Sequence, residues 1–194
     1  RDLVAEVAGE RDDAVARLYA ADSSLAARAY RKAIEHYEWR AQRQPENGMV
    51  LNNLAFAYQQ VKDDRALATA ERAFKLKPGD AAVADTLGMI LVEHGQAKRG
   101  AELLRDATSL APKSAEILHR YAQALGASGD RGEARKALDR LVGEALALGH
   151  PAQTEQSKSH VGLAGRREPG VFERHGEIER FFREVERFLV PVSP

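Results

Sequence analysis

Three prolines recur at nearly equal intervals, and this spacing constrains the fold more than any other feature of the sequence. They are Pro45, Pro78 and Pro112, and each stands between two apolar segments with helical periodicity. Proline ends a helix or occupies its first turn, because it lacks the N–H group that a helix interior needs. The interval therefore predicts a series of helical hairpins, each about 34 residues long.

Small residues recur within each interval at the points where two helices of a hairpin must approach closely. In each interval a small residue follows a large apolar one on the first helix, and a second small residue opens the second helix. This arrangement matches the large-small-large pattern of a helical repeat. The small residues are Ala55, Gly88 and Ala122 on the first helices and Ala66, Gly100 and Ala134 on the second helices.

The predicted turns of the three hairpins contain aspartate or glycine at positions 62–64, 94–96 and 128–130, as turn chemistry requires. Upstream, Ala33 and Tyr37 indicate the second helix of a further, degenerate repeat, and residues 3–20 have the pattern of an amphipathic helix. The turn signal before that second helix is at 22–24, which is early for a standard hairpin.

These patterns predict an all-α solenoid of helical hairpins, wound into a right-handed superhelix, with one extra helix. Residues 1–47 hold the N-terminal helices with the degenerate repeat, residues 48–148 hold three full repeats, and 149–172 form a linker. Residues 173–190 have the pattern of an amphipathic helix that docks on the solenoid or on a partner. Its apolar face consists of Ile178, Phe181, Phe182, Val185, Phe188 and Leu189.

Composition excludes several classes of function. Lysine plus arginine and aspartate plus glutamate each number 29, so the formal net charge of zero gives no general attraction to nucleic acid. The absence of cysteine excludes disulfides and thiolate metal sites, and no apolar run reaches the roughly 20 residues of a membrane span. The six histidines show no metal-binding spacing, and no catalytic or cofactor motif is present. We therefore expect no catalytic residue, no metal and no cofactor.

The first helices of the repeats carry the candidate binding residues. Stacked hairpins form a concave groove lined by their first helices, and side chains there that do not pack are free to bind. The mixture of apolar, amide and charged groups suits an extended peptide or a partner helix, although a solvated surface is the simpler reading of any single residue. The predicted groove residues are Met49, Asn52, Asn53, Phe56, Gln59, Asp85, Met89, Glu93, Glu116, His119, Arg120 and Gln123.

The sequence resembles the tetratricopeptide repeat family over Leu51–Val142. The segments LNNLAFAYQQ at 51–60 and ADTLGMILVEHGQAKRGAELLRDATSLAP at 84–112 are similar to bacterial tetratricopeptide lipoproteins of the PEP-CTERM/exosortase system, which accompany exopolysaccharide loci. The resemblance implies a periplasmic or outer-membrane-associated place, with the cytoplasm as the alternative. Another subclass of the repeat clamps C-terminal carboxylates with basic and amide residues. Asn53 and Arg120 resemble parts of that clamp, whereas Glu116 stands where a cation is wanted.

Two functions follow as expectations. In the first, the chain is a non-catalytic scaffold that binds a protein or peptide in its groove, within a bacterial envelope assembly. In the second, it is the repeat portion of a larger enzyme or secretion complex and docks through residues 173–190. An enzyme in its own right would need its chemistry from the residues after 148. Because the chain begins at Arg1 without methionine, we expect it to be a piece of a longer product.

Overall fold

The computed structural model describes the backbone of residues 3–147 and the side chains of residues 15–143. Within residues 3–147 the chain forms eight helices and no strand, which confirms the predicted all-α class. The predicted linker at 149–172 and the predicted C-terminal helix at 173–190 lie outside the described residues. The helices are α1 (Leu3–Ala26), α2 (Tyr30–Arg43), α3 (Gly48–Gln60), α4 (Arg65–Leu76), α5 (Ala81–Glu93), α6 (Ala97–Leu110), α7 (Ala115–Ser128) and α8 (Arg131–Ala147).

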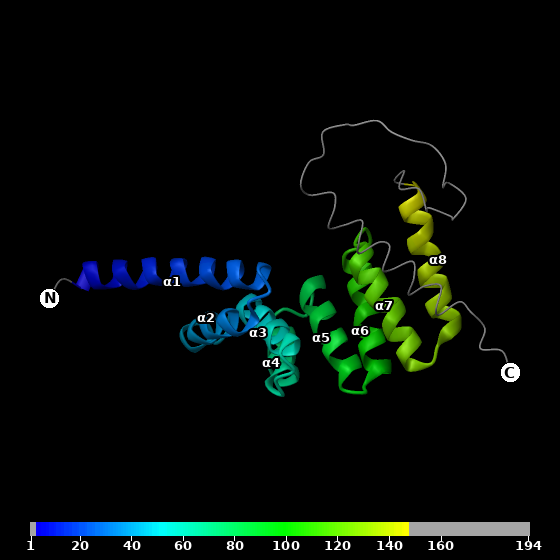
Figure 1. The fold of residues 1–194 in the computed structure, drawn as a ribbon, viewed down its shortest axis with the longest axis horizontal. Coiled ribbons are helices and arrows are strands. Elements are labelled where there is room, and N and C mark those ends of the chain that lie inside the picture. Colours follow the sequence, from blue (N-terminus) through cyan, green and yellow to red (C-terminus); the bar gives the residue numbers. More distant parts are fainter. Residues whose placement is uncertain (1–2, 148–194) are drawn as a thin grey trace, which may run out of the picture. The chain divides into compact units, whose positions relative to one another are not determined.

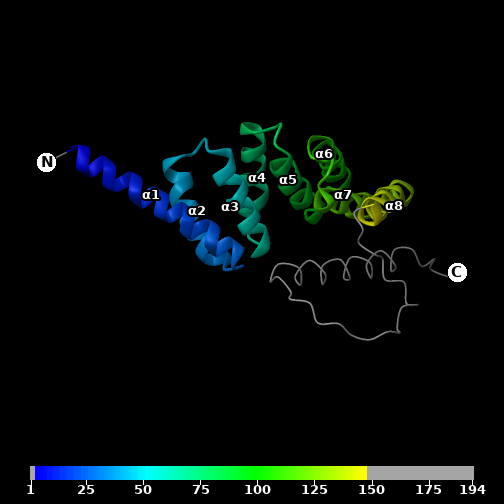
Figure 2. The same ribbon diagram turned by 90° about the horizontal axis from the view of Figure 1, so that it is seen from above.

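The helices pair as hairpins in chain order. The chain divides into two compact units, Arg1–Leu141 and Val142–Pro194. Within the first unit, α1 packs on α2, α3 on α4 and α5 on α6, and neighbouring hairpins meet through α2–α3, α4–α5 and α6–α7 (Figures 1 and 2). The first helices α3, α5 and α7 also contact one another in series. The predicted stack of hairpins is therefore confirmed for these helices.

Each first helix begins at a capping residue two positions after one of the three recurring prolines. The side chains of Asn47, Asp80 and Ser114 accept hydrogen bonds from backbone N–H groups of the first turns of α3, α5 and α7. These bonds satisfy donors that have no partner inside a helix. The proline ends the preceding helix and the cap starts the next one, which fixes the register of the repeat.

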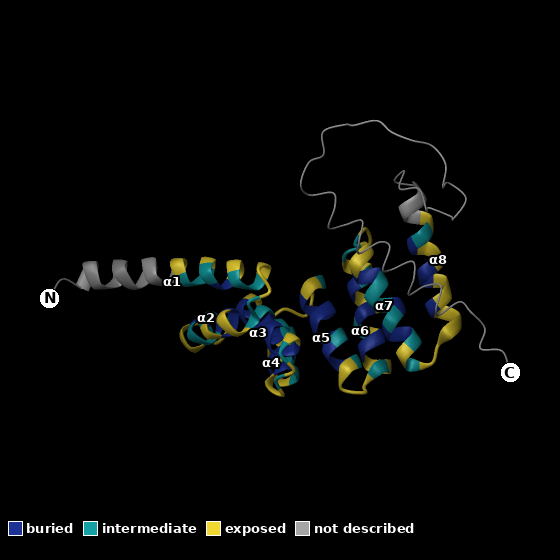
Figure 3. Cartoon of the chain, in the orientation of Figure 1, coloured by how far each residue is buried: buried dark blue, intermediate teal, exposed yellow. Residues whose placement is uncertain are grey.

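The hairpin α5–α6 shows why small residues recur at fixed positions. A Cβ atom added at Gly100 would lie 2.6 Å from the backbone oxygen of Gly88, and one added at Gly88 would lie 2.7 Å from Cγ of Leu104. The two helices cross so closely that only hydrogen fits between them. Helix α5 is largely buried (Figure 3), and the side chains of Leu87, Ile90 and Leu91 are fully enclosed.

The first hairpin has a longer first helix than the hairpins that follow it, with 24 residues in α1. Helix α1 continues through residues 22–24, where the sequence indicated a turn, and the chain turns instead at 27–29. There the backbone N–H groups of Ala27 and Ala29 bond to the carbonyl oxygens of Ser23 and Ser24, and Arg28 takes a positive φ of 57°. The turn signal at 22–24 does not end the helix, because Ala21 and Leu25 pack into the core and hold the intervening residues in the helix.

Candidate functional site

The twelve predicted groove residues all lie on the first helices α3, α5 and α7. Met49, Asn53 and Phe56 follow one another at intervals of three and four positions on α3, so they share one side of that helix. Met89 of α5 and Gln123 of α7 occupy the place of Phe56 in the two later repeats. We call the surface formed by the twelve residues the first-helix face.

The side chains of the first-helix face differ in exposure. Asn52, Gln59 and Asp85 are each only 6% exposed, whereas Met49 is 36% exposed. Phe56, Met89 and the α7 residues His119, Arg120 and Gln123 are half-buried, and Glu93 and Glu116 are exposed. The buried polar residues offer little area to a partner, so contact depends on the exposed and half-buried residues.

A hydrogen-bonded seam joins α3 to α5. Nε2 of Gln59 donates to Oε1 of Glu93 over 2.9 Å, and Nζ of Lys62 lies 3.0 Å from Oε2 of the same carboxylate. Lys62 was not predicted as a site residue. It lies in the turn after α3, where it takes a positive φ of 58°. One carboxylate thus bridges two consecutive hairpins.

An ion-pair cluster joins α5 to α7. Arg120 of α7 donates through Nη1 to Oδ2 of Asp85 on α5, and through Nη2 to Oε1 of Glu116 over 2.5 Å. Burial raises the pKa of Asp85 above its ordinary value, and the charge of Arg120 only partly opposes this. Oδ1 of Asp85 is buried and, within the described part of the chain, accepts no hydrogen bond.

A third set of bonds joins the first hairpin to α3. The hydroxyl of the fully buried Tyr37 donates to Oδ1 of Asp22 over 2.5 Å and accepts from Nδ2 of Asn53 over 3.2 Å. Asn52 in turn donates to Asn53 over 3.4 Å. Burial, with the neighbouring carboxylate of Asp22, raises the pKa of Tyr37. Asp22 was not predicted as a site residue.

These seams change the chemistry expected of the surface. Asn53 and Arg120, the two residues that resemble parts of a carboxylate clamp, are both bonded to neighbouring helices, and Glu116 pairs with Arg120. The apolar residues left for a partner are Met49, Phe56 and Met89, and Gln123 of α7 adds a half-buried amide. Phe56 also meets the ring of Tyr30 edge-on at 6.3 Å between centroids. The surface is an apolar stripe with polar and charged flanks.

The described residues contain no cluster of histidine or acidic side chains with the arrangement of a metal site. Among the helices described, none combines the length and apolar character that crossing a bilayer demands.

Residues 91–147 match the family model described as tetratricopeptide repeat. They cover the end of α5 and helices α6 to α8. A search of the curated proteins gives no match.

Three solved structures illustrate the likeness of the fold. The first is a mutant of O-GlcNAc transferase from Thermobaculum terrenum, which is 26% identical over 58% of this chain, with a TM-score of 0.55. The chain spans only 22% of the length of that transferase. The second is YrrB, described as a tetratricopeptide protein with an unusual peptide-binding site. It is 21% identical, the match covers 70% of this chain and 73% of YrrB, and the TM-score is 0.59. The third is MamA from Desulfovibrio magneticus RS-1. It is 16% identical, the match covers 71% of this chain and 78% of that MamA chain, and the TM-score is 0.63. The chain has the tetratricopeptide fold.

Proposed function

We propose that this chain is a non-catalytic tetratricopeptide scaffold that binds a protein or peptide along the first-helix face. The observation that carries the proposal is the apolar stripe of Met49, Phe56 and Met89. Met49 is exposed and the other two are half-buried, so the stripe offers apolar area that the stacking of the hairpins does not cover. Apolar side chains flanked by charged groups suit the apolar side of a partner helix or of an extended peptide. The structurally similar protein YrrB, described as having an unusual peptide-binding site, supports the same class of ligand.

A photo-crosslinking experiment in the native cell tests this proposal. A photoreactive phenylalanine analogue is placed at Met49 in one variant and at Leu110 of α6 in a second. Leu110 is also an exposed large apolar residue, at 50%, but it lies on a second helix. We expect an adduct with a discrete protein from position 49 and none from position 110. Equal adducts from both positions, or an adduct from position 110 alone, would contradict the proposal.

We further propose that the scaffold works in a bacterial envelope assembly, in the periplasm or on the outer membrane. The similarity of residues 51–60 and 84–112 to lipoproteins of the PEP-CTERM/exosortase system supports this context. Fractionation of the source cells, followed by immunoblotting, tests the compartment. Recovery of the protein only in the cytoplasmic fraction would overturn this part of the proposal and leave the scaffold function standing.

A second candidate is that the chain forms the repeat portion of a larger enzyme or secretion complex. The match to 22% of the length of an O-GlcNAc transferase favours it, because such repeats then occur beside a separate enzymatic part. The size of the native polypeptide on an immunoblot distinguishes the two candidates. A polypeptide several times longer than 194 residues supports the second.

A further inference from the structure

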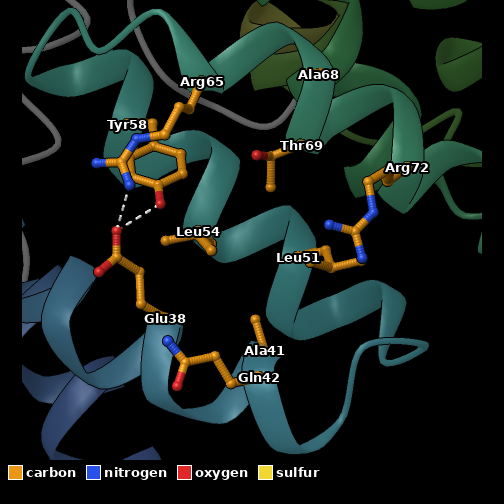
Figure 4. A pocket seen from close by; sticks show the side chains of 10 residues that line it. All are labelled: Glu38, Ala41, Gln42, Leu51, Leu54, Tyr58, Arg65, Ala68, Thr69 and Arg72. Carbon is orange, nitrogen blue, oxygen red and sulfur yellow. Dashed lines mark hydrogen bonds and ion pairs between the residues drawn. The ribbon is translucent and has the colours of Figure 1, made fainter.

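A cleft opens between the second helices α2 and α4, and α3 forms its floor (Figure 4). Its volume is about 530 Å³, within the range of roughly 300–1,000 Å³ that is common for ligand sites. Ala41 of α2 lines one side, Leu51 and Leu54 of α3 form the floor, and Ala68, Thr69 and Arg72 of α4 line the other side. We call this the second-helix cleft. Leu51 and Leu54 lie on the opposite side of α3 from Met49, Asn53 and Phe56, since successive residues are about 100° apart around a helix.

One end of the cleft is closed by three side chains that are joined by a hydrogen bond and an ion pair. The hydroxyl of Tyr58 donates to Oε1 of Glu38 over 2.6 Å, and Nη1 of Arg65 lies 2.7 Å from the same oxygen. The guanidinium of Arg65 also stacks over the Tyr58 ring at 4.3 Å from its centroid (Figure 4). Arg65 also pairs with Asp63, whose Oδ2 lies 2.7 Å from Nη2, so one cation is shared by two carboxylates and this end carries a net negative charge.

The surface between α4 and α6 is the equivalent of the cleft one repeat later, and the two can be compared position by position. It carries the same ion pair one repeat later, with Arg99 3.1 Å from Glu71, so the second helices are bridged there in the same way. The side chains differ. One repeat later, Phe74 occupies the place of Ala41 and Leu103 occupies the place of Thr69. Both Phe74 and Leu103 pack against the core. The cleft is lined by short side chains at these two positions, whereas its floor has Leu51 where the next repeat has the smaller Ala84.

The other end of the cleft carries a cation. Arg72 is exposed and donates to the backbone oxygen of Pro45 over 3.3 Å. Among residues 15–143 it has no carboxylate partner, unlike Arg65 in the same helix. A ligand carboxylate beside Arg72 would form a charge-assisted hydrogen bond, the stronger kind.

We propose that the second-helix cleft is a second binding site, which takes a peptide segment with a large apolar side chain next to an acidic residue. The apolar side chain lies over Leu51 and Leu54, beside Ala41 and Thr69. The acidic residue pairs with Arg72. The site lies on the opposite side of α3 from the first-helix face, so it adds a second ligand to the proposed scaffold.

Fluorescence anisotropy with defined peptides tests this site. The probe is a fluorescein-labelled pentapeptide, Asp-Glu-Phe-Glu-Asp, with an amidated C-terminus. Two control peptides have alanine in place of phenylalanine, or lysine in place of every acidic residue. Ala41→Phe fills the cleft with the residue that α4 already has at the same place, and Arg72→Gln removes the cation. Lys75→Gln, an exposed cation on α4 outside the cleft lining, is the matched control for Arg72→Gln.

We expect the acidic probe to bind the native sequence, and both control peptides to bind at least tenfold more weakly. Ala41→Phe and Arg72→Gln each lower the affinity for the probe at least tenfold, whereas Lys75→Gln and Met89→Ala leave that affinity unchanged. Absence of probe binding up to millimolar concentration overturns the proposal, as does full affinity in Ala41→Phe. Loss of binding in Met89→Ala alone would place the peptide on the first-helix face and also overturn it. Arg72 is exposed, so Arg72→Gln remains informative if Ala41→Phe does not fold.

Discussion

Arg120 of α7 donates a hydrogen bond to the carboxylate of Asp85 on α5, and this contact ties two consecutive repeats together. Asp85 is 8% exposed in its side chain and Arg120 is 26% exposed. An unpaired buried carboxylate costs folding free energy, so Arg120 stabilises the fold mainly by neutralising the charge of Asp85.

The stability of the protein is expected to depend on pH through Asp85. Burial raises the pKa of Asp85 in the folded chain, so the folded state keeps this proton at a pH where the unfolded chain has lost it. Lowering the pH from about 7 to about 4 therefore adds stability through this residue, and raising the pH removes it. Asp85→Asn cannot titrate. Urea unfolding across this pH range should show that the free energy of unfolding of the native protein rises relative to that of Asp85→Asn as the pH falls.

Arg120→Ala provides the control for this dependence. Removing the cation that lowers the pKa of Asp85 raises that pKa further, so the loss of stability with rising pH becomes steeper. At neutral pH the variant should lose about 3 kcal/mol, because it leaves a buried charge unpaired. A gap between the native protein and Asp85→Asn that stays constant with pH would contradict the assignment.

Gly100→Ala should destabilise the hairpin α5–α6 by about 1–3 kcal/mol, because its methyl group would meet the backbone oxygen of Gly88 at 2.6 Å. Gly143→Ala is the matched control. Gly143 also lies within a helix, but a Cβ atom there meets nothing within 4 Å. Alanine is the better helix former, so this control should gain about 0.5–1 kcal/mol. Chemical denaturation measures both, and equal effects of the two substitutions would argue against the close crossing.

Asp80→Ala should cost about 1 kcal/mol, because it removes the side-chain oxygen that accepts from the N–H groups of Ala82 and Val83. Asp80→Asn keeps an acceptor oxygen, so its stability should fall by only about 0.3 kcal/mol. Thermal unfolding compares the two. If Asp80→Asn lost as much as Asp80→Ala, the negative charge rather than the cap would be responsible.

The hairpins could be predicted from the sequence because local constraints repeat. Pro78 ends one helix, Asp80 starts the next, and Gly88 and Gly100 allow that next pair to approach closely. Each of these effects acts within one repeat, so spacing along the chain reveals it. The start of α2 lacks such a signal: Ala29 provides no side-chain cap, and the turn before it contains no glycine. Packing of Leu25 then decided where α1 ends.

The chemistry of the binding surfaces could not be predicted in the same way. Gln59 and Glu93, or Asp85 and Arg120, are 34 and 35 residues apart and meet only after the repeats stack. Their side-chain directions decide whether a polar residue faces a partner or a neighbouring helix. The second-helix cleft is a comparable case, because Ala41 has meaning only when it is compared with Phe74 one repeat later.

Tyr37→Phe tests whether the first hairpin is held to the stack by its buried hydroxyl. The change removes the bonds from Tyr37 to Asp22 on α1 and from Asn53 on α3, while the ring stays in place. We expect a loss of about 1–2 kcal/mol and faster hydrogen exchange in residues 15–26 of α1, with little change in α5 and α6. Tyr19→Phe removes a hydroxyl from a tyrosine on α1 that is 77% exposed, and it should leave both measurements unchanged. If the two variants exchange alike along α1, the hydroxyl of Tyr37 does not hold α1 in place, and packing around Ala21 must do so alone.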